Sequence, residues 1–171
     1  MKFLTTALIA GLLTFASMAA AADTPRAGGK LEITTLEGKQ LDIKDLAGKP
    51  VLVFYFSTDC SHCQATARIL APIYEEYHVK GLEIVGVTLN PTAKDNLGGF
   101  VKQFGVEFPV GLGDRAHFVE FSGVAGRFYY PYLLFVDQAG QIREEHEGAD
   151  RAYFADLNAS LRKSLDQLLT Y

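Results

Sequence analysis

Two cysteines three positions apart are the residues whose types and spacing most clearly suggest chemistry. Cys60 and Cys63 are the only cysteines in the sequence; they follow the apolar run Val51–Phe56 and open a long helical pattern. A cysteine at a strand-to-helix junction lies at a helix N-terminus, where unpaired N–H groups and the helix dipole favour a thiolate. A thiolate with a second thiol one turn away is the minimum required for thiol–disulfide exchange.

Other uses of this cysteine pair fit the sequence less well. A structural disulfide across so short a loop would stabilise the fold by only about 2 kcal/mol, and structural bridges usually join distant segments. Zinc needs more ligands than Cys60, Cys63 and His62 supply, so we predict no metal site. Covalent haem attachment requires histidine directly after the second cysteine, where Gln64 stands. The remaining histidines are interpreted as surface or internally satisfied residues: His78, His117 and His146.

The elements that must position the cysteines form an alternating series. Buried strands are predicted at Val51–Phe56 and Leu82–Leu89 because both segments are continuously apolar or β-branched. Residues 61–78 show helical spacing, with Pro72 inside it predicting a kink. Further strands are expected at 30–36, 108–110, 132–136 and 141–147, a short strand or turn at 41–46, and further helices at 96–104, 115–121 and 152–169. This order predicts an α/β domain with helices on both faces of a mixed sheet.

The N-terminal segment predicts export. Lys2, an apolar stretch from Phe3 to Ala16 and small residues ending near Ala22 are typical of a cleaved signal peptide over 1–22. We expect a polar linker over 23–30, one domain over 31–171, and no membrane insertion after cleavage. An exported chain would be periplasmic or otherwise extracytoplasmic, where disulfides persist. The net charge of −4, or −5 without Lys2, provides no basic face for nucleic acid.

The chain resembles the thioredoxin-like fold, and within it the exported TlpA/ResA-type thiol–disulfide oxidoreductases. Residues 46–63, which end in Cys60-Ser-His-Cys63, carry the strongest likeness, together with 81–88, 130–142 and the closing helix. The resemblance implies that Cys60 is the exposed nucleophile and Cys63 the buried resolving thiol. It also implies that Pro131 is the cis-proline beside the disulfide and that the Tyr130 backbone docks the substrate chain.

Several positions depart from the pattern of that family. Asp59 stands where relatives usually carry tryptophan, and its charge should disfavour a thiolate at Cys60. Thr66 and Arg68 replace a Glu and a Pro after the second cysteine, and Phe54 aligns with the buried acid of thioredoxin, so no proton acceptor for Cys63 is evident.

The residue before the second cysteine bears on the direction of electron flow. His62 occurs at this place in disulfide oxidases and isomerases of the same fold, and as a hydrogen-bond donor it would favour the Cys60 thiolate. Asp59 and His62 therefore act in opposite directions. Whether the protein reduces or oxidises its substrates stays open on these residues.

The resulting prediction is an exported thiol–disulfide oxidoreductase that needs no bound cofactor. Its partners would be protein thiols or disulfides, such as apocytochrome c, and a redox protein embedded in the membrane. Two alternatives stay open. Two thiolates can hold Cu(I), which indicates a copper-delivery protein. A peroxiredoxin-like peroxidase would use Ser57 and either Arg68 or Arg127, although Val53 stands where that motif needs proline.

Overall fold

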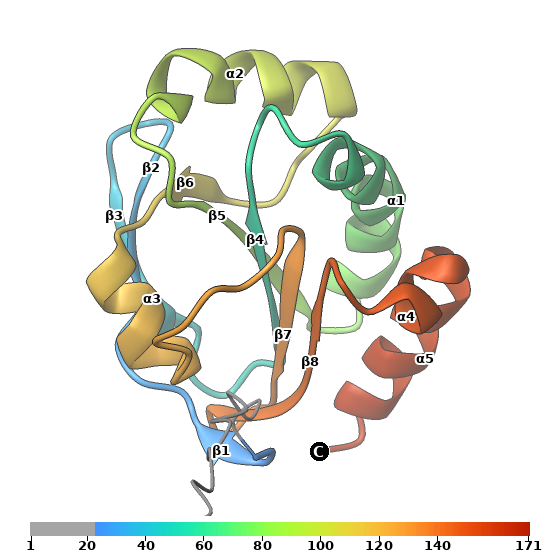
Figure 1. The fold of residues 1–171 in the computed structure, drawn as a ribbon. Helices are drawn as coiled ribbons and strands as arrows, with labels where there is room; N and C mark the ends of the chain where they lie inside the picture. The colour runs from blue at the N-terminus through green and yellow to red at the C-terminus, as the bar shows by residue number, and fades with distance from the viewer. Residues whose placement is uncertain (1–22) are drawn as a thin grey trace, which may run out of the picture.

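One mixed sheet of eight strands organises residues 23–171, the part of the chain that this computed structural model describes. The predicted signal peptide lies outside these residues. The strand order is β1-β8-β7-β4-β5-β6-β2-β3 (Figure 1). The strands are β1 (Arg26–Ala27), β2 (Glu32–Thr35), β3 (Gln40–Asp42), β4 (Val51–Phe56), β5 (Glu83–Thr88), β6 (Val110–Leu112), β7 (Tyr132–Val136) and β8 (Gln141–Glu147). The helices are η1 (Ile43–Leu46), α1 (Ser61–His78), α2 (Ala93–Phe104), α3 (Arg115–Ser122), α4 (Arg151–Ala155) and α5 (Leu157–Leu168).

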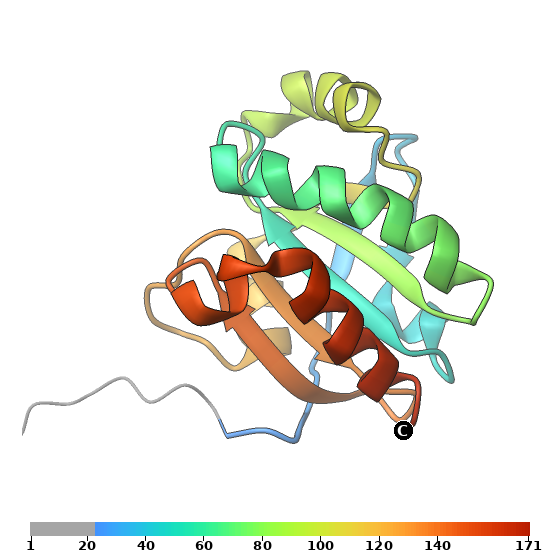
Figure 2. The same ribbon diagram turned by 90° about the vertical axis from the view of Figure 1, so that its right-hand side faces the viewer.

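Strand β4 lies at the centre of the sheet, between β5, its parallel neighbour, and β7, its antiparallel neighbour. All six of its residues are buried because helices cover both faces. The alternate residues Leu52, Phe54 and Phe56 pack with side chains of α1, α2 and α5, and the other three pack with α3. Figure 2 shows α1 and α5 running beside each other over one face of the sheet. The predicted α/β architecture with a mixed sheet is confirmed.

The N-terminal residues differ from the linker that the sequence predicted. Arg26–Ala27 form β1, which pairs antiparallel with β8 at the sheet edge. The Arg26 guanidinium donates to the Ser122 carbonyl at 2.8 Å and pairs with Glu145. The sequence did not predict this strand because the segment is polar and glycine-rich and two residues show no periodicity. The pairing of β1 also depends on β8, more than 100 positions away.

Two other elements were placed imprecisely. The strand expected at 108–110 lies instead at Val110–Leu112, since Pro109 has no N–H to donate to a ladder. The single helix expected at 152–169 is divided into α4 and α5 at Asp156. The Asp156 carboxylate accepts a hydrogen bond from the Ala159 N–H at 3.2 Å and thereby caps a new helix. Helix α1 itself continues through Pro72.

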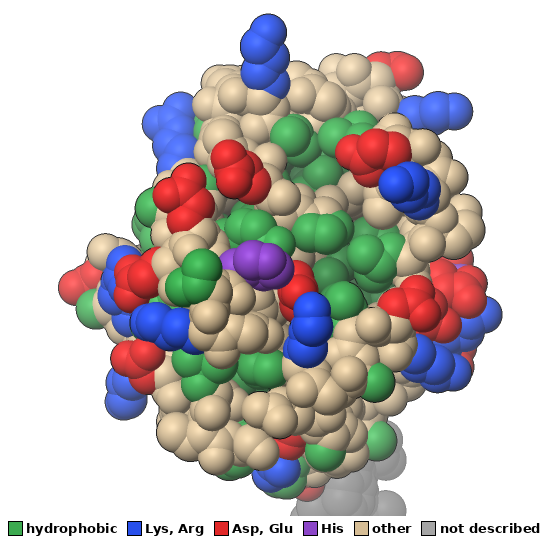
Figure 3. Space-filling view, turned by 180° about the vertical axis from the view of Figure 1, so that it is seen from behind, with side chains coloured by type: hydrophobic (Ala, Val, Ile, Leu, Met, Phe, Trp, Pro, Cys, Tyr) green, Lys and Arg blue, Asp and Glu red, His purple; other side chains and the backbone are tan. Residues whose placement is uncertain are grey.

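The surface carries charges of both signs. On the face opposite to that of Figure 1, acidic and basic side chains are interspersed with apolar ones (Figure 3). Within residues 23–171, no helix is both long enough and apolar enough to cross a membrane.

Candidate active site

The sulfur of Cys60 lies at the junction between β4 and α1. After β4 ends at Phe56, a tight turn forms in which the Cys60 N–H donates to the Ser57 carbonyl at 3.2 Å. Cys60 is the N-cap of α1, and its Sγ accepts a hydrogen bond from the Cys63 N–H at 3.3 Å. Cys60 is partly exposed. A partly exposed sulfur that accepts an N–H at a helix N-terminus is well placed to carry negative charge.

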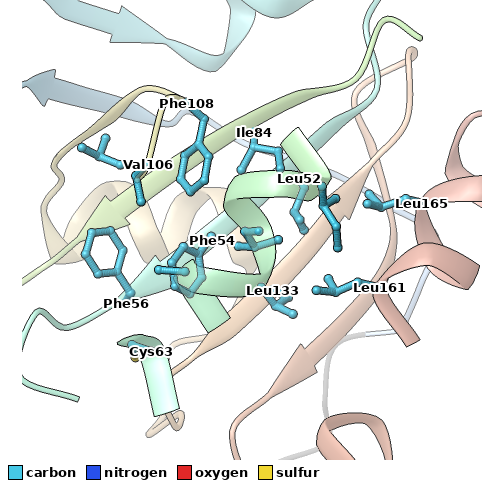
Figure 4. Close-up of a cluster of buried hydrophobic side chains, with 14 of the residues drawn as sticks. Leu52, Phe54, Phe56, Cys63, Ile84, Val106, Phe108, Leu133, Leu161 and Leu165 are labelled. Carbon is cyan, nitrogen blue, oxygen red and sulfur yellow. The ribbon is translucent and has the colours of Figure 1, made fainter. Parts of the chain in front are cut away.

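Cys63 occupies a different environment one turn along the same helix. Its side chain is fully buried and belongs to the apolar cluster that also contains Phe54, Phe56 and Leu133 (Figure 4). Burial raises the pKa of the Cys63 thiol, and the hydrogen bond with Cys60 raises it further. Cys63 is therefore a protonated thiol at neutral pH, held behind an accessible sulfur.

The Tyr130–Pro131 peptide bond is cis, as the resemblance implied. Pro131 is buried, whereas Tyr130 is half-buried and packs edge-to-face on Phe128 with ring centroids 5.0 Å apart. Burial raises the pKa of the Tyr130 hydroxyl, and charge on Cys63 raises it as well. Tyr130 and Cys60 both pack against the apolar cluster that contains Cys63.

The segment before Pro131 is fastened by groups that the sequence did not indicate. The Tyr129 N–H donates to the Glu147 carboxylate at 2.9 Å, and the Gly148 N–H donates to the Tyr129 carbonyl at 3.0 Å. Arg115 donates to the Ala125 and Gly126 carbonyls, at 3.0 and 2.6 Å. Gly148, directly after β8, was the one local signal that could have suggested the contact with Tyr129.

The other residues singled out from the sequence lie around the pair without completing a proton relay. The side chains of His62 and Asp59 are exposed. No hydrogen bond found among the described residues joins the His62 ring to Cys60; its carbonyl instead accepts from the Thr66 hydroxyl at 2.9 Å. Phe54 is a buried apolar residue and therefore cannot accept a proton from Cys63. The roles of His62, Tyr130 and Pro131 stay predictions.

The structure also shows where the residues considered for metal binding and peroxide chemistry lie. Residues 23–171 contain no group of three or more His, Cys, Asp and Glu side chains that could hold a metal ion. The Arg68 guanidinium lies over the Phe104 ring, 5.1 Å from its centroid, and Arg127 is exposed.

Comparison with solved structures defines the fold class. The structure superposes on a thiol:disulfide interchange protein of the thioredoxin family from Chlorobium tepidum TLS with a TM-score of 0.69, at 22% identity over 85% of this chain and 99% of that chain. It superposes on a DsbF homologue from Corynebacterium diphtheriae with a TM-score of 0.71, at 16% identity over 85% and 88% of the two chains. The fold is thioredoxin-like.

Sequence comparison places the chain within a family. Residues 18–161 match the Redoxin family, and the chain belongs to it. The chain is also similar to the thiol-disulfide oxidoreductase ResA of Bacillus thuringiensis subsp. konkukian (strain 97-27), at 29% identity over 116 residues, which are 68% of this chain. The match spans 65% of the length of that relative.

Proposed function

We propose that this protein is an exported thiol–disulfide oxidoreductase in which Cys60 and Cys63 exchange electrons with protein substrates. The observation that supports this most strongly is the contrast between the two sulfurs. The Cys60 sulfur is partly exposed and accepts a hydrogen bond from the Cys63 backbone N–H at 3.3 Å, whereas the Cys63 side chain is fully buried. This asymmetry gives an attacking thiol and a resolving thiol within one helical turn.

The exchange proceeds in two balanced steps when the protein acts as a reductant. The Cys60 thiolate attacks one sulfur of a substrate disulfide, so a mixed disulfide forms and the other substrate sulfur leaves as a thiolate that takes up a proton. Cys63 then loses its proton and attacks the Sγ of Cys60, which releases the second substrate thiol. The Cys60–Cys63 pair is oxidised by two electrons, and a partner dithiol reduces it again.

An extended substrate chain would dock next to the cysteine pair. We assign the Tyr130 backbone and Pro131 to alignment of that chain and His62 to modulation of the thiolate. The protein would act outside the cytoplasm after removal of residues 1–22, with 31–171 as its functional domain. Its reducing partner would be a membrane-embedded redox protein, and its substrates would include apocytochromes c in cytochrome c maturation.

Reduction of insulin disulfides in the presence of dithiothreitol tests the activity. Cys60→Ser should abolish the acceleration of insulin precipitation without unfolding the protein, because serine is also a favourable N-cap. Activity in Cys60→Ser equal to that of the wild type would refute the proposal.

Copper binding by the wild type, and peroxide consumption by Cys60→Ser and Cys63→Ser, test the two alternative functions. Tight 1:1 binding of Cu(I) without insulin reduction would identify a copper-delivery protein. Peroxide consumption that survives Cys63→Ser but not Cys60→Ser would identify a peroxidase.

A further inference from the structure

His146, outside the cysteine site, is held between two carboxylates. Its Nδ1 lies 2.7 Å from an Asp150 oxygen and its Nε2 lies 2.7 Å from a Glu144 oxygen. The side chain is only 17% exposed. A neutral imidazole has one N–H and can donate to only one of these carboxylates, whereas the imidazolium donates to both. The geometry therefore matches a protonated ring.

The groups around His146 come from four elements. Glu144 of β8 and Asp150, the N-cap of α4, contact the two ring nitrogens. The Tyr153 ring of α4 stacks on the imidazole with ring centroids 3.5 Å apart. From α5, the Ser164 hydroxyl donates to Glu144 at 2.9 Å, and Lys163 acts on the same carboxylate. From β7, the neutral residues Leu133 and Phe135 lie against it. Two anions thus directly face the ring, and two cations, Arg143 and Lys163, line the same surface pocket as the ring.

The cluster closes a short turn over residues 147–150. Glu144 lies on β8 before this turn and Asp150 is the last residue of the turn, so the imidazolium bonds the end of the turn to β8. Asp150 also caps α4 by accepting the Tyr153 N–H at 3.1 Å, and its own N–H donates to the Glu147 carbonyl at 2.8 Å. The turn is therefore fixed to β8 and to α4 at once.

This turn is the support for the segment before Pro131. Glu147 accepts the Tyr129 N–H, Gly148 donates to the Tyr129 carbonyl, and the Gly148 backbone lies directly against the Tyr130 carbonyl. His146 is thus connected through Glu147 and Gly148 to the backbone that precedes Pro131.

We propose that His146 is a positioning residue that, when protonated, holds turn 147–150 and thereby the Tyr129–Pro131 backbone in the conformation that docks a protein substrate. Deprotonation removes the imidazole donor from one of the two carboxylates and loosens the turn. Loss of the His146 proton as pH rises therefore weakens docking, and this effect acts on KM and not on the sulfur of Cys60. This inference rests on the proposed function, because docking serves the exchange reaction.

The variant His146→Gln tests the proposal, with His117→Gln as a matched control, since His117 also contacts carboxylates but belongs to α3. For His146→Gln we expect KM for insulin to rise about tenfold at pH 6.5, the alkylation rate of Cys60 by iodoacetamide to stay within about twofold, and the control to resemble the wild type. Equal KM values and equal pH profiles for His146→Gln and the wild type would overturn the proposal.

Two measurements keep the test decisive if the variant fails to fold or if insulin is not a substrate. In the wild type, the rise of KM with pH should share its midpoint with the NMR titration of the His146 ring; separate midpoints would overturn the proposal. The protection factors of the Tyr129 and Tyr130 amides, which correct for the intrinsic rise of exchange with pH, should fall through the same midpoint, and unchanged protection factors would likewise overturn it. A wild type inactive toward every disulfide would refute the proposed function, while amide exchange would still decide the role of His146.

Discussion

The backbone of Gly148 lies against the carbonyl of Tyr130 so closely that a Cβ at position 148 would approach the Tyr130 oxygen to 2.2 Å. The same Cβ would lie 3.2 Å from the Pro131 nitrogen. Position 148 therefore accepts only glycine unless the Tyr130–Pro131 backbone moves. The end of β8 and the segment before Pro131 behave as one unit.

Gly148→Ala should displace the Tyr130–Pro131 backbone. We expect a loss of about 1–3 kcal/mol in the free energy of unfolding, because an inserted methyl group meets backbone atoms, together with a higher KM for insulin. Urea denaturation and insulin kinetics measure the two effects.

Gly98→Ala is the control for this substitution. Position 98 lies in α2 with no neighbouring atom within 4 Å of an added Cβ, so alanine should stabilise the protein by about 0.5–1 kcal/mol. Unchanged stability and unchanged KM in Gly148→Ala would contradict the close contact with Tyr130.

The raised pKa of Cys63 predicts an alkaline loss of stability in the reduced protein. The unfolded thiol ionises near pH 8.5, whereas the buried thiol stays protonated, so the native state binds more protons above that pH and its stability falls. Between pH 8.5 and 9.5 the free energy of unfolding should fall by about 1 kcal/mol more in the wild type than in Cys63→Ala. The same pH dependence in both proteins, each measured in urea with a phosphine reductant, would show that Cys63 is not shielded.

Removal of the charge at Asp59 should make Cys60 more reactive. Asp59 is exposed beside the sulfur, and exposed charges interact by at most about 1 kcal/mol, so Asp59→Asn should raise the iodoacetamide rate at pH 7 about two- to fivefold. The difference should shrink in high salt. Glu75→Gln, at an exposed position further along α1, should leave the rate unchanged. A slower rate in Asp59→Asn would mean that the carboxylate assists the thiolate.

Arg26 should be important for stability although it lies in the segment that the sequence marked as a linker. Its guanidinium pairs with Glu145, which also accepts the Tyr132 hydroxyl at 2.6 Å. Arg26→Ala would leave this largely buried carboxylate without its cation, at a cost of about 2–3 kcal/mol. Lys30→Ala removes an exposed ion pair with Glu32 and should change stability by less than about 0.5 kcal/mol. Equal effects in urea denaturation would contradict this difference.

The sequence predicted those parts of the fold that depend on local pattern. Strand β4 and helix α1, which position both cysteines, have the predicted bounds because a buried strand and a long helix each repeat their signal over many residues. The hairpin β7–β8 was found for the same reason. Strand β1 and the division of the last helix at Asp156 were missed because a long-range pairing determines the first and a single capping side chain the second.

The candidate site was predicted less completely than the fold. The cysteine pair is marked by its spacing, and the cis-proline by a Tyr130-Pro131 dipeptide within the family resemblance. The contacts that hold Tyr129 and Tyr130, in contrast, come from β8 and the turn after it. His146 was interpreted as a surface or internally satisfied residue, but its partners Glu144 and Asp150 could not be identified because they form a cluster only when β8 and α4 meet.

The most direct test of the account is the capture of a mixed disulfide. Reduced Cys63→Ser is mixed with a protein that carries a disulfide, the reaction is quenched with acid, and the adduct is located by peptide mass spectrometry. We expect a covalent adduct at Cys60 that accumulates in Cys63→Ser and is absent from Cys60→Ser. Adducts that accumulate on Cys63 in Cys60→Ser, with none at Cys60, would contradict the assignment of Cys60 as the attacking thiol.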